Sequence, residues 1–77
     1  MQDHQAAIED FNQAIEFDPR YADAYHCRCL VRNLQGDKQG VIEDFQKAAT
    51  LYLQAGKLEQ YKVLLKNITD IEITTVN

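Results

Sequence analysis

The sequence predicts an all-α fold in which about four antiparallel helices form a helix-turn-helix repeat. Two segments share the residues IEDF, which begin at Ile8 and again at Ile42, so the offset is 42 − 8 = 34 residues. A period of 34 residues is typical of stacked helix pairs. Apolar residues around each copy are three or four positions apart, which is the spacing of one helix face. Glycines stand where the turns between the predicted helices fall.

The first predicted helix spans about residues 4–17. It stops before Pro19, because proline disfavours a helical conformation in the residue that precedes it. The second helix spans about residues 21–35 and ends at Gly36, which suits a left-handed C-terminal cap. Asp37 follows directly and suits the N-cap of the next helix. A connection this short predicts that the two helices are antiparallel.

The third helix is predicted over residues 38–55, and Gly56 ends it in the same way. A fourth helix over residues 57–68 has apolar residues on one side and lysines nearer the other. Residues 69–77 are rich in β-branched side chains and carry no helix signal, so we expect an unstructured or weakly extended C-terminal tail there. Residues 1–68 are therefore expected to form one helical repeat domain.

Aromatic, small and turn residues recur with this period. In the complete copy they are Tyr25, Cys29, Gly36, Asp37, Val41, Phe45 and Ala48. In the preceding copy they are Asp3, Ala7, Phe11, Ala14 and Pro19. With these residues the chain resembles the tetratricopeptide repeat (TPR) family, an α-solenoid family, from residue 3 to about 68. The resemblance implies the second half of a repeat at 3–20, a complete repeat at 21–55 and a capping helix at 57–68.

The resemblance implies a protein-protein interaction module, a scaffold that binds a peptide or a partner helix on the concave face of its stacked helices. By family analogy that face includes residues of the second helix, namely Asp23, His26, Cys27, Leu30 and Asn33. The alternative is a structural cap, in which these helices end a longer TPR superhelix and bind no ligand. Fold alone does not decide between the two.

Arg28 and Arg32 lie four positions apart on the second helix, at places where the family usually has leucine and often tyrosine. A buried guanidinium needs a carboxylate partner, because an unpaired buried charge costs several kcal/mol. The repeated IEDF places Asp10 and Asp44 on the flanking helices. We therefore expect ion pairs from an arginine to Asp44, Asp10 or both. The alternative is a solvated basic stripe that adds little stability.

His26, Cys27 and Cys29 raise the remote alternative of a metal or redox site. Cys27 and Cys29 are two positions apart on a helix, so their side chains point about 200° apart and converge on no common ion or bridge. His26 and Cys29 share a face, but structural zinc sites take four ligands. We therefore expect no metal and no cofactor, with Cys29 acting as a small residue in a close helix contact.

Composition and missing motifs argue against other functions. The formal net charge of -4 argues against nucleic acid, whose binding proteins concentrate basic residues on one face. No apolar run approaches the roughly 18 residues of a membrane span. The chain has no Gly-rich phosphate loop and no serine, so we expect no enzyme. These features predict a cytoplasmic protein, and the TPR resemblance implies that its partner is a protein or peptide.

The number of repeats predicts self-association. Roughly three repeats are normally needed for independent stability, whereas this sequence holds one complete unit and two partial ones. The first helix lacks a preceding partner in this sequence, so we expect an apolar strip that includes Ile8, Phe11 or Ile15 to be partly uncovered. Uncovered apolar strips usually mark an interface. The chain is therefore expected to be a homo-oligomer or a fragment of a longer repeat array.

Overall fold

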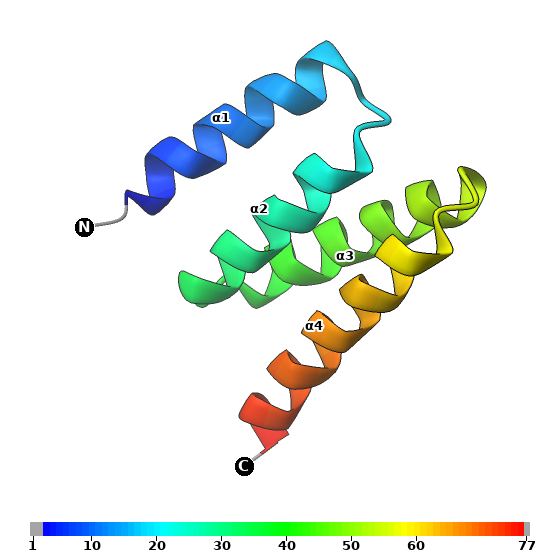
Figure 1. The fold of residues 1–77 in the computed structure, drawn as a ribbon. Coiled ribbons are helices and arrows are strands. Elements are labelled where there is room, and N and C mark those ends of the chain that lie inside the picture. Colours follow the sequence, from blue (N-terminus) through cyan, green and yellow to red (C-terminus); the bar gives the residue numbers. More distant parts are fainter. Residues whose placement is uncertain (1–2, 77) are drawn as a thin grey trace.

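The computed structural model describes residues 3–76, with side chains described for residues 3–67, and consists of four helices (Figure 1). They are α1 (His4–Phe17), α2 (Ala22–Leu34), α3 (Lys38–Gln54) and α4 (Leu58–Val76). No residue from 3 to 76 lies in a strand. The predicted all-α class is confirmed, and the helices begin within one residue of their predicted starts.

Both glycine turns close a helix in the same way. Gly36 and Gly56 have φ of 77° and 70°, a left-handed conformation that glycine adopts without the steric penalty of a Cβ atom. In each turn the N–H that follows the glycine donates to a carbonyl five residues earlier, at 2.9 Å for Asp37 and 2.8 Å for Lys57. The Asp37 side chain also caps α3, because it accepts from the N–H of Gly40 at 2.9 Å.

Helix α4 continues to Val76, so the expectation of a non-helical tail after residue 68 was wrong for the described residues. Asn77, the last residue of that tail, lies outside them. β-branched residues lower helix propensity by only about half a kcal/mol each, and residues 57–76 contain no proline or glycine. Adding residues to a helix that has already formed costs little, and these residues contain no signal that would stop it. No helix in the described part of the chain is long and apolar enough to cross a bilayer.

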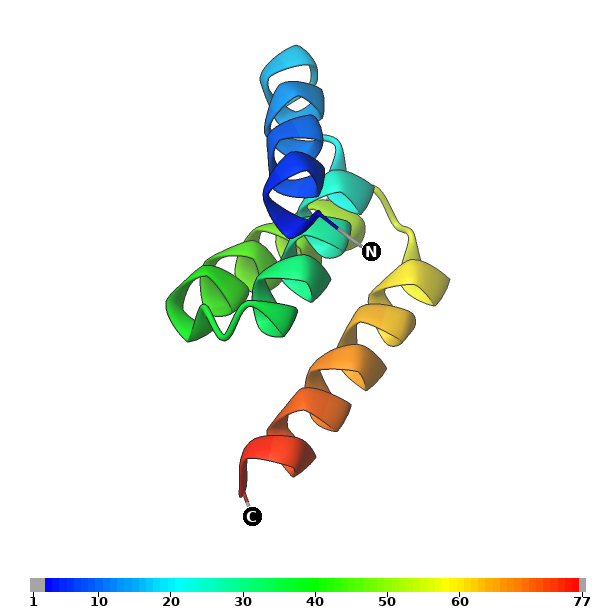
Figure 2. The same cartoon turned by 90° about the vertical axis from the view of Figure 1, so that its left-hand side faces the viewer.

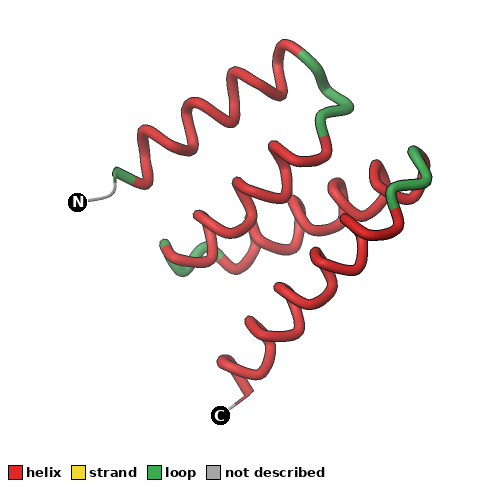
Figure 3. The backbone as a smooth tube through the Cα atoms, in the orientation of Figure 1, coloured by secondary structure: helices red, strands yellow, loops and turns green. Residues whose placement is uncertain are grey.

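Helix α2 is the centre of the fold. It packs against α1 on one side and α3 on the other, and α4 packs against α3 (Figure 1). A quarter turn shows α1 and α4 lying apart, at opposite ends of the molecule (Figure 2). Short turns join successive helices (Figure 3). Helices α1 and α4 are therefore the two ends of a row of helices.

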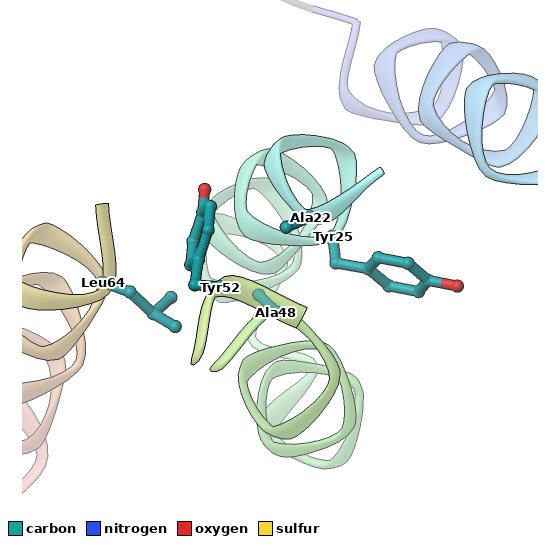
Figure 4. Packing of buried hydrophobic residues seen from close by; sticks show 5 residues of the cluster. All are labelled: Ala22, Tyr25, Ala48, Tyr52 and Leu64. Carbon is teal, nitrogen blue, oxygen red and sulfur yellow. The ribbon is translucent and has the colours of Figure 1, made fainter. Parts of the chain in front are cut away.

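The core forms where α2, α3 and α4 meet. Its buried members are Ala22, Tyr25, Ala48, Tyr52 and Leu64. The ring of Tyr52 lies between α2 and Leu64 of α4 (Figure 4). Full burial of a leucine such as Leu64 stabilises a fold by about 2 kcal/mol, and this contact holds α4 against α3. The alanines have little side chain, which lets α2 and α3 approach closely.

Candidate partner-binding face

The outward face of α2 carries the residues that the sequence indicates for partner binding. His26 is half-buried, and the other four are exposed: Asp23, Cys27, Leu30 and Asn33. Leu30 is 38% exposed, and Leu34 in the last turn of the helix is 64% exposed. These positions recur three or four residues apart, so they form one stripe along α2. We call this set of residues, Leu34 included, the α2 stripe.

A chain of hydrogen bonds fixes one edge of the α2 stripe. The Tyr52 hydroxyl donates to Oδ1 of Asp23 at 2.6 Å and lies 3.1 Å from Nδ1 of His26. Nδ2 of Asn67 lies 2.9 Å from the other ring nitrogen, Nε2. Since the Tyr52 hydroxyl uses its proton in the hydrogen bond to Asp23, His26 donates from Nδ1 to the hydroxyl oxygen and accepts from Asn67 at Nε2. One polar chain therefore joins α2, α3 and α4.

Burial keeps His26 and Tyr52 of this chain uncharged. It lowers the pKa of His26 from its usual value, and the Asp23 carboxylate opposes this effect less strongly. Burial also raises the pKa of the Tyr52 hydroxyl, and the hydrogen bond to Asp23 adds to the increase. At neutral pH the imidazole is therefore uncharged and the phenol protonated. Each group keeps the donor or acceptor role that the geometry requires.

Sequence reasoning missed Tyr52 and Asn67 as parts of this site. A signal for Tyr52 was present, because Leu53 replaces the proline that closes the repeat in the family and so lets α3 run on to Gln54. Tyr52 lies on that extra turn and reaches over to α2. No comparable signal existed for Asn67, since its place beside His26 depends on how α4 packs.

Both arginines of α2 bind Asp44, which is 2% exposed. Arg28 donates to both carboxylate oxygens, from Nη2 to Oδ1 at 2.7 Å and from Nε to Oδ2 at 2.9 Å. Nη1 of Arg32 donates to Oδ2 at 3.1 Å. Asp10, the other partner considered, is exposed, and among residues 3–67 it forms no ion pair with either arginine.

Arg28 also reaches the first helix. Its Nη1 donates to Oδ1 of Asn12 at 2.6 Å, and its guanidinium carbon lies 5.4 Å from the ring centroid of Tyr25. The hydrogen bond to Asp44 raises the pKa of Arg28, so its charge is permanent. A buried carboxylate held this way fixes the register of helices more than it adds net stability. Here it aligns α1, α2 and α3.

The two cysteines occupy different surroundings. Cys29 is fully buried, and its thiol donates to the carbonyl of Val41 at 3.5 Å, where α2 meets α3. Burial raises its pKa to about 11, which keeps the thiol protonated and unreactive. Cys27 is exposed. No group of three potential ligands that could hold a metal, from His26 and the cysteines or elsewhere, occurs among the described residues.

The first-helix residues expected in an uncovered strip are partly covered by α2. Ile8 is 8% exposed, so the expectation that it lies uncovered was wrong, because α2 packs against that side of α1. Phe11 and Ile15 are half-buried, and Ile15 contacts the core. The large apolar residue of α1 that remains exposed is Phe17, at its end.

Comparison with known proteins supports the TPR resemblance. The family model described as TPR repeat matches residues 1–36. Tetratricopeptide repeat protein 36 of Mus musculus is 47% identical over 49 residues, which are 64% of this chain and 26% of that protein. The Homo sapiens protein is 45% identical over 49 residues, which are again 64% of this chain and 26% of that protein. A homolog from Nematostella vectensis is 43% identical over 54 residues, 70% of this chain and 30% of that protein.

These similarities confirm the resemblance to the TPR family. The chain spans about a quarter of the length of the Mus musculus and Homo sapiens relatives, 26% in each case. No solved structure matches the chain significantly. The repeat identity of the helices is therefore supported, and the partner has to be inferred from the chain's own surface.

Proposed function

We propose that this chain, which carries tetratricopeptide repeat sequence, is a protein-protein interaction module that binds a peptide or partner helix along the α2 stripe. The observation that supports this most directly is the exposure of Leu30 and Leu34 beside a polar chain that is already ordered. Exposed apolar residues rimmed by polar groups are typical of binding surfaces. Because the hydrogen bonds of His26 fix its ring, binding would not have to order it.

The chemistry of the stripe suits an amphipathic partner. Leu30 and Leu34 are one turn apart and offer apolar contact to residues spaced at i and i+4 on a bound helix. Asn33 offers one acceptor and two donors to a peptide backbone. Asp23 is exposed at the opposite end of the stripe and adds a negative charge. A partner with alternating apolar and basic groups therefore fits this face.

The alternative function is a structural cap of a longer TPR array. It is favoured by the position of α1 and α4 at the two ends of the row (Figure 1), where further helices would stack. On this alternative the α2 stripe binds no ligand. The proposal includes no enzymatic activity, cofactor or metal, and no nucleic-acid or membrane partner. It places the chain in the cytoplasm, where thiols such as those of Cys27 and Cys29 stay reduced.

A capture experiment with matched variants tests the proposal. The immobilised chain is exposed to cell extract, and the retained proteins are quantified by mass spectrometry for the wild type, Leu30→Lys and Ile42→Lys. Ile42 is exposed on α3 and serves as the control. We expect Leu30→Lys to lose partners that the other two retain, by roughly tenfold for a loss of about 1.4 kcal/mol.

A peptide from a retained partner is then titrated into the isotopically labelled chain. Chemical-shift changes should centre on His26 and Asn33. Equal retention by all three proteins, together with no shift along the α2 stripe, would favour the capping alternative.

A further inference from the structure

The 34-residue offset identifies a face of α1 that is open. Three residues of α3 that are buried beneath α2 are Val41, Asp44 and Ala48. Their counterparts in α1, each 34 residues earlier, are Ala7, Asp10 and Ala14. In α1 the aspartate is exposed and both alanines are half-buried. Within residues 3–76 no helix covers this face of α1 in the way that α2 covers α3.

Helix α4 is the structural counterpart of α2. The first residues of the two helices are 36 positions apart (58 − 22), and Tyr25 and Tyr61 match at the same offset (61 − 25). At this offset Leu65 corresponds to Cys29, the residue of α2 that packs on α3. Leu65 is 37% exposed, and Leu58, two turns earlier on the same edge, is 56% exposed. Helix α4 therefore has an uncovered apolar edge where α2 has a buried one.

Helix α1 and the first half of α4, over residues 57–67, carry opposite charge, whereas Asp70 and Glu72 bring the charge of residues 57–76 as a whole to zero. Residues 3–18 contain no lysine or arginine and have these five carboxylates: Asp3, Glu9, Asp10, Glu16 and Asp18. Residues 57–67 contain Glu59 and three lysines, which are Lys57, Lys62 and Lys66. Opposite charge steers the two surfaces together, and like charge disfavours a contact between two copies of α1.

We propose that the chain binds a second copy of itself head to tail, with α4 of one copy on the open face of α1 of the next. Leu58 and Leu65 cover Ala7 and Ala14, and the lysines of α4 approach Asp10. The two surfaces differ, so the contact is heterologous and each dimer keeps one open α1 and one open α4. Association therefore continues beyond the dimer as concentration rises.

Sedimentation velocity at micromolar to submillimolar concentration tests the proposal with two variants of the full chain. Ala7→Lys/Asp10→Lys alters the open face of α1, and Leu58→Lys/Leu65→Lys alters the edge of α4. Each variant alone should associate at least about tenfold more weakly than the wild type, a factor that corresponds to 1.4 kcal/mol. An equimolar mixture should form a 1:1 dimer and nothing larger, because it holds one intact surface of each kind.

Matched controls separate this contact from general effects of charge. Gln5→Lys/Glu9→Lys makes the same change in charge on exposed positions of α1 outside the open face and should associate like the wild type. Ile42→Lys/Leu53→Lys is the matched control for the α4 variant, because it places two lysines at exposed apolar positions of α3. Far-UV circular dichroism checks that each variant is helical, and Asp10→Lys alone replaces the α1 double variant if that variant is not.

Three results would overturn the proposal. The first is a wild-type chain that remains monomeric over the whole concentration range. The second is undiminished self-association of the α4 variant, which would indicate a two-fold contact between copies of α1. The third is a mixture of folded variants that forms no dimer.

Discussion

Helices α1 and α3 contain the same four residues, IEDF, and bury opposite ones. In α1 Ile8 is buried and Asp10 is exposed, whereas in α3 Ile42 is 50% exposed and Asp44 is buried. Helix α2 covers the isoleucine side of α1 and the aspartate side of α3. Helix α4 follows α3 but diverges from it toward the start of α3 (Figures 1 and 2). The motif thus specifies a helix, and its neighbours decide which residues are buried.

The N-terminal caps of the two helices are alike. Asp3 accepts from the N–H of Ala6 at 3.1 Å, and Asp37 accepts from the N–H of Gly40 at 2.9 Å. Residue 40 is a glycine in α3 because the side chains of Asp37 and Arg32 occupy the space where a Cβ would lie. The cap is therefore a local feature that the sequence repeats, and the glycine reflects packing against α2.

The largest expected difference is between the two aspartates. Asp44→Ala leaves two arginines without their carboxylate and should lower the free energy of unfolding by about 2–4 kcal/mol, near the lower end for a broken buried pair. We place the cost near that lower end because the side chains of Arg28 and Arg32 remain 15% and 22% exposed. Solvent therefore screens part of their charge. Asp10→Ala should change it by under about 0.5 kcal/mol. Urea unfolding followed by circular dichroism measures both, and equal losses would remove the distinction.

The isoleucines should show the reverse order. Ile8→Ala removes buried atoms between α1 and α2 and should cost about 2–3 kcal/mol. Ile42→Ala removes a half-exposed side chain and should cost about 1 kcal/mol or less. The same unfolding assay applies. A larger loss at Ile42 would show that α4 covers this part of α3 in solution.

Gly40→Ala examines the difference between the caps. Alanine is favoured over glycine in a helix by about 1 kcal/mol, yet a Cβ here would lie 2.7 Å from Cδ of Arg32 and would displace the capping carboxylate of Asp37. Loss of that cap costs about 1 kcal/mol, and movement of Arg32 adds to it. We expect net destabilisation of about 1 kcal/mol. A more stable variant would mean that both side chains move aside freely.

The effect of pH should come from His26 of α2. The pKa of His26 is lower in the folded chain than its usual value. As pH falls below about 6.5, the unfolded chain therefore takes up a proton first and stability declines until the pH reaches the folded pKa. Because His26 is only half-buried, the loss should stay under about 1 kcal/mol. Unfolding at pH 7.5 and 5.5 should show a smaller decline for His26→Gln than for His4→Gln.

Local sequence signals predicted most of the fold. Asp18-Pro19, Gly36 and Gly56 end helices through backbone preferences that need no tertiary contact. The pairing of Asp44 with the arginines could also be anticipated, because a buried charge requires an opposite one. The 34-residue period then gives the order in which the helices pack.

Features that depend on the position of a neighbour could not be predicted in the same way. The burial of Ile8 depends on which side of α1 receives α2. The contact of Asn67 with His26 depends on where α4 lies. The extension of α4 to Val76 was missed because weak local preferences were taken to end a helix that had already formed.

The central claim is that neighbouring helices, and not the IEDF motif itself, decide which residues of the motif are buried and paired. A double-mutant cycle between Arg28 and Asp44 tests it most directly. Unfolding free energies of the wild type, both single alanine variants and the double variant give the coupling energy, and the same cycle with Asp10 in place of Asp44 is the reference. We predict a coupling of about 1.5–3 kcal/mol for Arg28 with Asp44 and under about 0.5 kcal/mol for Arg28 with Asp10. Equal couplings in the two cycles would contradict the account.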